Sequence, residues 1–297
     1  MHKFIFTCNP LNNKELPLIL TDIPFTCFDI ETTGLNPLDH NIIEVGAVKF
    51  TINEGIIDTF SSFIAFDGVI PKEVIKIHGI TDNMIEDAPS ISQVLKDFIT
   101  FIDNNYLLAH NASFDASFIG FEIGKLGLEY PTNPIYDSLI LSRKVFPNVK
   151  SHSLTNLIKT FKIESTQSHR ALDDALATMK VFFKLIKRIN NSGIKDLNYL
   201  KRLVTPIFFS QFTLESFNNF TKLLKQLNQA IDESNHLMIT YTNRLNEVTK
   251  RDILPSSIIL KNGYIYLEGF CYLREEERHF RIDRIKKLQV QSGTLID

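Results

Sequence analysis

Two carboxylates, Asp29 and Glu31, stand two positions apart at the end of a short apolar run that begins at Thr26. Residues i and i+2 of an extended strand project from the same face, so both carboxylates are expected to point the same way. Neighbouring carboxylates repel each other and resist ionisation unless a cation compensates them. Oxygen ligands of this kind suit Mg²⁺ or Mn²⁺. Taken alone, the pair is more typical of a solvated strand end than of a metal site.

Further groups suited to the same chemistry stand at other element ends. Asp115 lies where an apolar strand enters a helix, a place where the helix dipole alone favours a carboxylate. His169 and Asp174 lie at the start of the last helix expected in the N-terminal half. A lone histidine at a helix start is more often solvated or capping than catalytic. Four acidic residues and a histidine, all at the ends of strands or helices, are a much less probable coincidence than any one of them alone.

The composition limits the class of protein. The chain has 297 residues, of which 44% are hydrophobic and 22% charged, so we expect two globular domains, each with its own core. The cysteines, Cys8, Cys27 and Cys271, are too few and too scattered for a disulfide scaffold or a zinc site. No apolar run approaches the ~20 residues of a membrane span, and the N-terminus does not resemble a secretory signal. These features predict a cytoplasmic protein without a membrane partner.

The N-terminal part is expected to form a mixed α/β sheet with helices on its faces. Three segments rich in β-branched and aromatic residues predict an antiparallel meander, after which shorter strands alternate with helices. Residues 1–21 are expected to be an extension that precedes the sheet. The expected strands are Thr26–Ile30, Ile42–Phe50, Gly55–Phe66, Tyr106–Ala109 and Ile135–Asp137, and the expected helices are Ser90–Ile102, Ser113–Leu126, Leu154–Thr160 and Ala171–Ile189.

The C-terminal part has a different pattern. Asn190–Gly193 is the expected domain boundary, because Asn, Ser and Gly break the helical periodicity. A connector, 191–220, leads to a helix at Thr221–Asn235 and then to strands, with Asn262-Gly263 as a hairpin turn. Residues 1–190 carry 17 Lys and Arg against 22 Asp and Glu, a net charge of −5, and residues 191–297 carry 15 against 12, a net charge of +3. The expected strands are Leu237–Tyr241, Asp252–Lys261, Tyr264–Tyr272 and His279–Val290.

Three segments resemble a known family. They read F-D-I-E-T-T-G-L at 28–35, H-N-A-S-F-D at 110–115 and H-R-A-L-D-D-A at 169–175. In order, spacing and flanking residues they resemble the three motifs of the DEDDh 3′–5′ exonucleases, the family of the DnaQ-like proofreading subunits, ribonuclease T and oligoribonuclease. Ile77–Thr81, which contains His78, is similar to the family's H-G-I-T segment. The resemblance covers about residues 22–190 and implies a ribonuclease H-like mixed sheet.

The resemblance also implies the roles of the acidic residues. The enzyme would hydrolyse phosphodiesters from the 3′ end of DNA or RNA and release 5′-mononucleotides, with two divalent cations, Mg²⁺ or Mn²⁺. His169 would be the general base. Asp173 remains the alternative to Asp174 as a ligand, and Asp137 is interpreted as a structural or helix-capping residue. The implied metal ligands are Asp29, Glu31, Asp115 and Asp174.

Other residues near the motifs are candidates for substrate contact. Backbone atoms around Thr32 and Thr33 would hold the terminal 3′-hydroxyl, and Leu35 would wedge against the last base. His78, Asn111 and Phe114 are further candidates, with core packing as the alternative for Phe114.

The tail resembles a WYL domain over about residues 221–297, which implies a small SH3/Sm-like β-barrel. The resemblance rests on Ile239–Tyr241, Asn262–Leu267 and Arg278–Ile285, with Ile265 in place of the aromatic that opens the family's triplet. WYL domains of bacterial regulators are associated with sensing nucleotides or nucleic acid. Arginines would contact phosphate and tyrosines would stack on bases, or else pair with nearby acids and pack the barrel. The candidates are Tyr241, Tyr264, Tyr266, Arg274, Arg278, Arg281 and Arg284.

Two functional classes remain open. The first is a metal-dependent exonuclease whose basic tail binds nucleic acid or a nucleotide, and the second is a catalytically silent nucleic-acid-binding or regulatory protein. The presence of the whole catalytic set favours the first. A polymerase-associated proofreading subunit is a further alternative. Gln211–Phe217 faintly resembles a sliding-clamp-binding peptide, but its aromatic is one residue out of register, which favours a helix start over a clamp or polymerase partner.

Overall fold

The computed structural model describes residues 20–164, 169–190, 196–243, 247–261 and 264–291. Its chain divides into two compact units, with the boundary between Leu214 and Glu215. The expected extension (apart from its last residues), the expected boundary at 191–193 and the Asn262-Gly263 turn lie outside the described residues. The domain limits 22–190 and 221–297 therefore stay a prediction.

The first unit contains a mixed five-stranded sheet in the order β3-β2-β1-β4-β5. β1, β2 and β3 form the expected antiparallel meander, and β4 and β5 continue from β1 in parallel. β1 is thus the central strand, so residues from the elements on either side of it can lie next to its C-terminal end. The strands are β1 (Phe25–Thr32), β2 (Ile42–Thr51), β3 (Gly55–Phe63), β4 (Tyr106–Ala109) and β5 (Ile135–Asp137).

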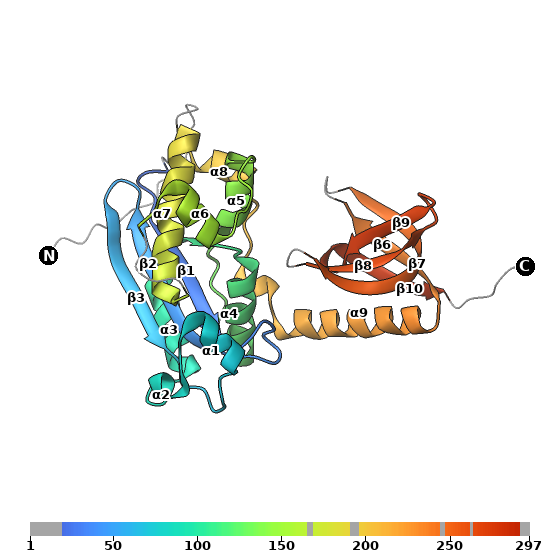
Figure 1. Ribbon diagram of the computed structural model, residues 1–297, viewed down its shortest axis with the longest axis horizontal. Helices are drawn as coiled ribbons and strands as arrows, with labels where there is room; N and C mark the ends of the chain where they lie inside the picture. Colours follow the sequence, from blue (N-terminus) through green and yellow to red (C-terminus); the bar gives the residue numbers. More distant parts are fainter. Residues whose placement is uncertain (1–19, 165–168, 191–195, 244–246, 262–263, 292–297) are drawn as a thin grey trace, which may run out of the picture. The chain divides into compact units, whose positions relative to one another are not determined.

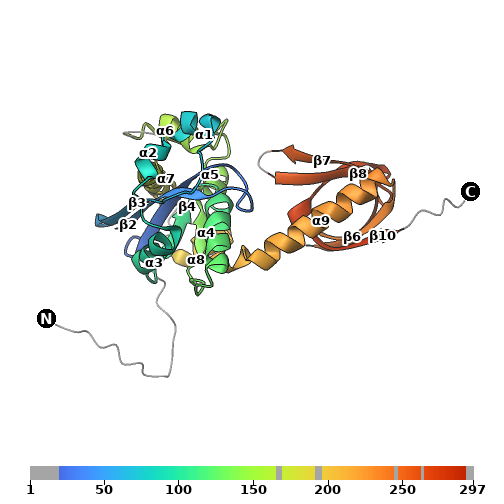
Figure 2. The ribbon, with the colours of Figure 1, turned by 90° about the horizontal axis from the view of Figure 1, so that it is seen from below.

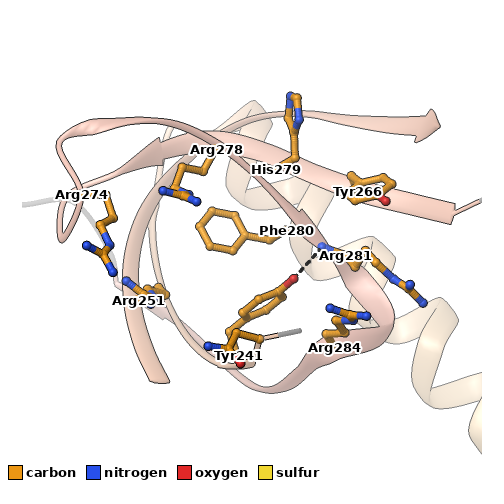
Figure 3. Close-up of a pocket in the computed structure, with 10 residues that line it drawn as sticks. Tyr241, Arg251, Tyr266, Arg274, Arg278, His279, Phe280, Arg281 and Arg284 are labelled. Atoms are coloured by element: carbon orange, nitrogen blue, oxygen red, sulfur yellow. Dashed lines mark hydrogen bonds between the residues drawn. The ribbon is translucent and has the colours of Figure 1, made fainter. Parts of the chain in front are cut away.

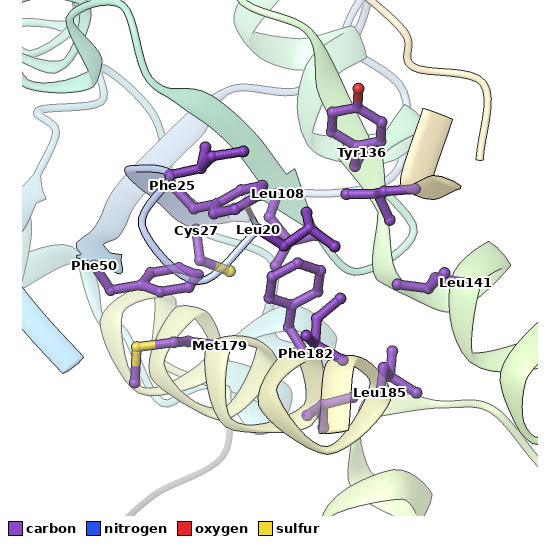
Figure 4. Close-up of a cluster of buried hydrophobic side chains, with 14 of the residues drawn as sticks. Leu20, Phe25, Cys27, Phe50, Leu108, Tyr136, Leu141, Met179, Phe182 and Leu185 are labelled. Carbon is purple, nitrogen blue, oxygen red and sulfur yellow. The ribbon is translucent and has the colours of Figure 1, made fainter. Parts of the chain in front are cut away.

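Helices cover both faces of this sheet, and Figure 2 shows α3 and α7 on opposite sides. The core under α7 includes Phe25, Phe50 and Phe182, whose rings pack together (Figure 4). Four short helices, α1, α2, α5 and α8, were not expected, although the side chain of Asp137 caps α5 as anticipated. The helices are α1 (Lys72–His78), α2 (Asp82–Ile85), α3 (Ile91–Ile102), α4 (Ser113–Lys125), α5 (Ser138–Val145), α6 (Leu154–Phe161), α7 (Ala171–Asn190) and α8 (Leu197–Leu203), followed by the 3₁₀ turn η1 (Phe209–Gln211).

The second unit consists of one helix and an antiparallel sheet in the order β10-β6-β7-β8-β9 (Figure 1). Leu227 and Ala230 of α9 are fully buried against this sheet. The helix begins at Leu214, seven residues before the expected start and within the segment compared with a clamp-binding peptide. The elements are α9 (Leu214–Asp232), β6 (His236–Thr242), β7 (Val248–Lys261), β8 (Tyr264–Cys271), β9 (Glu276–Arg281), η2 (Ile282–Arg284) and β10 (Ile285–Gln291).

The small β-rich fold is confirmed, but the expected barrel does not close. Within the described residues, β9 pairs with β8 and β10 pairs with β6, and the two edge strands do not pair with each other. The expected long strand His279–Val290 is broken by η2, where Ile282 enters the core with 1% of its surface exposed. Among the described helices, none combines the length and apolar content needed to cross a bilayer.

Candidate active site

The end of β1 presents Asp29 and Glu31 on one face, as their spacing predicts. Both residues are half-buried, and β1 is flanked there by β2, with Asp29 opposite Gly46 and Glu31 opposite Glu44. One carboxylate oxygen from each of Asp29, Glu31 and Asp174 lies within 4.8 Å of the other two. Residues 145 positions apart in the chain therefore meet at one point.

Asp115 lies next to this group of carboxylates. It lies in the first turn of α4 and is 3% exposed. Its Oδ1 accepts a hydrogen bond of 3.2 Å from the backbone N–H of Ile30, the residue between Asp29 and Glu31. This bond ties the start of α4 to the end of β1 and holds the Asp115 carboxylate beside the pair.

The start of α7 supplies Asp174 and the adjoining His169. His169 precedes the helix with a left-handed backbone (φ 64°), and its N–H donates to Asp174 Oδ2 at 3.2 Å. The His169 side chain is exposed, and so is available to a bound molecule. The helix approaches β2 closely because Gly46 has no side chain: a Cβ there would lie 2.1 Å from the backbone N of Leu172.

The electrostatics of the cluster favour a bound cation. Burial, reinforced by Asp174 and Glu44, raises the pKa of Glu31 to about 8. Burial also raises the pKa of Asp115 to about 8, although its backbone hydrogen bonds oppose the shift. The pKa of Asp29 is raised by burial and then by the charges of Asp115 and Glu31, and that of Asp174 is raised by burial. Half-buried carboxylates that repel one another are a donor set that fits divalent cations such as Mg²⁺ or Mn²⁺.

Two residues that the sequence analysis did not single out organise the site. Glu44, 1% exposed on β2, receives Arg170 Nη2 at 2.7 Å and Nε at 3.1 Å, and also the N–H of Ala171 at 3.1 Å. The Arg170 guanidinium lies 5.0 Å from the centre of the Phe63 ring. The feature of the sequence that could have identified Glu44 is the presence of an acid within the apolar run I-I-E-V-G-A-V. Asp173 is half-buried next to Asp174, outside the group of oxygens that meet.

The last residue of β1 and the loop that follows hold three of the expected substrate-contact residues, Thr32, Thr33 and Leu35. Thr32 and Thr33 are buried, and their hydroxyls take part in bonds within the loop, to Gly34 O at 2.6 Å and from Asn41 N at 2.9 Å. Their side chains are therefore occupied, which leaves backbone atoms for a ligand. Leu35 is 81% exposed, as a residue that contacts a base would be.

The other three expected contacts differ in character. His78 is 4% exposed, and its Nδ1 accepts a hydrogen bond from Ile80 N at 2.9 Å. Burial lowers the pKa of His78, and Glu44 partly offsets this shift. Asn111 is exposed with a left-handed backbone, and its N–H donates to Asp137. Phe114 packs on Phe118 and is half-buried, so packing accounts for part of its surface.

Comparison with known proteins agrees with this geometry. Residues 26–182 match the sequence model of a family described as RNase_T: Exonuclease. The chain belongs to this exonuclease family. The predicted DEDDh-type domain and the predicted enzyme class, an exonuclease, are thereby confirmed, and nucleases of this type depend on divalent metal ions. Residues 222–290 match the WYL domain model, which confirms the second resemblance.

The relatives of the exonuclease domain are parts of much longer proteins. The chain is 41% identical over 187 residues to a DNA polymerase III PolC-type from Oceanobacillus iheyensis and 40% identical over 187 residues to that of Bacillus subtilis. Each match covers 63% of this chain but 13% of the polymerase. Escherichia coli exonuclease I in complex with a dT13 oligonucleotide superposes with a TM-score of 0.53 at 15% identity, covering 84% of this chain and 55% of that one, which shows the fold alone.

In the WYL domain, the expected contact residues line one cavity of about 540 Å³ (Figure 3). Tyr241 and Phe280 meet edge to face with ring centres 5.3 Å apart, and the Tyr241 hydroxyl accepts from Arg281 N at 3.3 Å. Two arginines form ion pairs with carboxylates, Arg278 with Glu276 and Arg281 with Asp283, and of these the Arg281 pair is the one that the packing alternative expected. The side chain of Tyr264 lies outside the described structure. The lining residues are Tyr241, Asn243, Arg251, Tyr266, Arg274, Arg278, His279, Phe280, Arg281 and Arg284.

Proposed function

We propose that the exonuclease domain hydrolyses single-stranded DNA from its 3′ end and releases 5′-mononucleotides. The observation that carries this proposal is the convergence of carboxylates from β1, α4 and α7 beside the exposed His169. The similarity to PolC-type DNA polymerases supports DNA over RNA as the substrate. A catalytically silent role is disfavoured, because every member of the catalytic set is present and gathered.

Asp29, Glu31, Asp115 and Asp174 would hold two divalent cations, Mg²⁺ or Mn²⁺. When bound there, the cations would neutralise phosphate charge, acidify a water molecule and stabilise the departing 3′ oxygen. The raised pKa values of Glu31 and Asp115, about 8 in each case, support this assignment, because each marks a carboxylate that ionises with difficulty unless a cation compensates it.

His169 would accept the proton of the attacking water. The Asp174 carboxylate receives the backbone N–H of His169, which sets the position of the histidine relative to a metal ligand. An exposed imidazole can reach a water molecule beside the phosphate and pass its proton to solvent.

The 3′-terminal nucleotide would lie along the loop after β1. Backbone atoms of Thr32 and Thr33 would hold its 3′-hydroxyl, and Leu35 would contact the base. Asn111, Phe114 and His78 would supply further contacts.

The test is a digestion of single-stranded DNA and RNA oligonucleotides of one sequence, labelled at either end. With Mn²⁺ or Mg²⁺, the 5′-labelled oligonucleotide should give a ladder of products that become shorter with time. The label of the 3′-labelled oligonucleotide should be released at once as a mononucleotide. EDTA should abolish both. A ladder from the 3′ label instead would overturn the direction, and intact oligonucleotides under every condition would overturn the activity.

A second candidate is proofreading in association with a polymerase, which the PolC-type relatives favour. A proofreading enzyme should remove a mismatched 3′ nucleotide from a primer–template faster than a matched one. Equal rates on the two primers would argue against this role.

We also propose that the WYL domain contacts nucleic acid or a nucleotide through the cavity lined by Tyr241 and Tyr266. The support is the gathering of five arginines around aromatic side chains, a combination that suits phosphate and base together.

A further inference from the structure

The segment that carries His169 has few anchors of its own. His169 and Arg170 precede the first residue of α7, Ala171, and His169 has a left-handed backbone with φ 64°. A histidine in this conformation depends on its surroundings to be held, because a non-glycine residue reaches this region only at a cost. The described contacts that hold the segment include the bond from His169 N to Asp174, the bond from Asp174 N to Arg170 O at 2.9 Å, and the contacts of Arg170 and Ala171 with Glu44.

Glu44 connects this segment to the sheet through hydrogen bonds from Arg170 and Ala171. It lies on β2 opposite Glu31, and its side chain is 2% exposed. Both of its oxygens are used: Oε1 receives Arg170 Nη2 at 2.7 Å and Nε at 3.1 Å, and Oε2 receives Ala171 N at 3.1 Å and Arg170 Nε at 3.2 Å. Both Glu44 oxygens therefore accept hydrogen bonds from the start of α7, although Glu44 stands beside Glu31.

The side chain of Arg170 is held by two kinds of contact. Its guanidinium makes a fork-like pair with Glu44 and lies on the face of the Phe63 ring, 5.0 Å from its centre. The fork of a guanidinium restricts orientation as well as distance, which a point charge does not do. Arg170 also follows His169 directly, so its position limits where the imidazole can lie.

We propose that Glu44 and Arg170 are positioning residues that hold His169 and the first turn of α7 in register with the carboxylates of β1. The inference rests on the proposed hydrolysis. Arg170 acts through His169 and not by touching the phosphate, since its charge is already matched by Glu44.

The test compares Arg170→Met with Arg170→Lys and with the double variant Glu44→Gln/Arg170→Met. Removing the fork should lower kcat on single-stranded DNA by about ten- to a hundredfold and leave KM within about twofold. Arg170→Lys keeps the cation but not the fork, so it should recover more of the thermal stability than of the kcat. The double variant removes the buried charge left by the single one, so it should regain most of the lost thermal stability but not the kcat.

A matched control and a readout without substrate complete the design. Lys125→Met breaks another ion pair to a buried acid, Glu122, at the far end of α4, and should leave kcat unchanged. The amide of Ala171, bonded to Glu44 in the wild type, should exchange with D₂O at least about tenfold faster in Arg170→Met.

Three results would overturn the inference. A raised KM with unchanged kcat would make Arg170 a substrate contact. Recovery of kcat in the double variant would show that the Glu44–Arg170 pair contributes only to the stability of the fold. Unchanged amide exchange would show that the segment is held without the pair. An inactive wild-type protein would instead contradict the proposed function, while the exchange measurement would still test the anchor.

Discussion

At the scale of single residues, the site is defined by carboxylates that are costly to ionise. Glu31 and Asp115 have pKa values raised to about 8 by burial and by neighbouring negative charges. Between the pKa of an unfolded carboxyl, about 4, and that of the folded state, the folded protein binds more protons than the unfolded chain. The free energy of unfolding of the metal-free protein must therefore fall as the pH rises through this window.

We predict that the melting temperature of the metal-free protein decreases from about pH 5 to about pH 8. Mn²⁺ should reverse the trend, because it competes with protons and binds best where the carboxylates are ionised. Calorimetric scans with EDTA and with Mn²⁺ measure both effects. In Asp115→Asn the metal-free pH slope should become shallower, and a slope identical to that of the wild type would contradict the assigned pKa of Asp115.

The proximity of the site residues could be predicted from the sequence where motif and strand geometry coincide, whereas their roles stay a prediction. The i, i+2 spacing correctly brought Asp29 and Glu31 to one face, and the motifs placed Asp115 and Asp174 beside them. The role of Glu44 could not be read in this way, because its partner Arg170 lies 126 positions away. Only the fold shows that a buried acid and a distant arginine meet.

At the scale of elements, the distance between β2 and α7 decides where Asp174 lies. Gly46 stands opposite Asp29 on β2, and a Cβ there would come within 2.1 Å of Leu172 N and 2.3 Å of the Ala171 carbonyl carbon. Both contacts are backbone atoms, so the helix must move as a body to accept a side chain.

We predict that Gly46→Ala lowers kcat by about a hundredfold, because it displaces Asp174 and His169 from the β1 carboxylates. It should also destabilise the protein by about 1–3 kcal/mol. Gly269→Ala is the control, since its Cβ would meet the backbone oxygen of Leu254 at 2.5 Å, within the other unit of the chain. The control should lose stability and keep kcat; an equal loss of kcat in both variants would refute the argument.

Most elements followed from their periodicity, and the misses have physical reasons. The meander and the amphipathic helices α3 and α7 are long enough to show a clear pattern. The helices α1 and α2 span 7 and 4 residues, too short for periodicity to register. The strand expected at His279–Val290 is wrong because Ile282–Arg284 form the 3₁₀ turn η2, at which the chain passes from β9 to β10.

At the scale of the whole molecule, charge is divided between an acidic N-terminal part and a basic C-terminal part. The net charges are −5 for residues 1–190 and +3 for residues 191–297. In the WYL domain, five arginines line the cavity of about 540 Å³. Among the described residues, Arg251, Arg274 and Arg284 have no carboxylate within ion-pair distance, whereas Arg278 and Arg281 are paired.

We predict that Arg274→Ala/Arg284→Ala weakens binding of single-stranded DNA and reduces the slope of log K against log salt by about 1–2. Fluorescence anisotropy over a range of salt concentrations measures both. Lys286→Ala/Lys287→Ala removes the same charge from the exposed face of β10 in the same unit and should change the slope less. Equal slopes for the two double variants would show that net charge, and not the cavity, governs binding.

The most direct test of the central claim compares two adjacent aspartates. Asp174→Asn removes an oxygen ligand from the group formed with Asp29 and Glu31, whereas Asp173→Asn makes the same chemical change one residue away. Metal-dependent hydrolysis of a 5′-labelled oligonucleotide should fall at least about a hundredfold in Asp174→Asn and stay within about threefold of wild type in Asp173→Asn. Full activity in Asp174→Asn, or equal loss in both variants, would contradict the claim that these carboxylates form the metal-binding catalytic site.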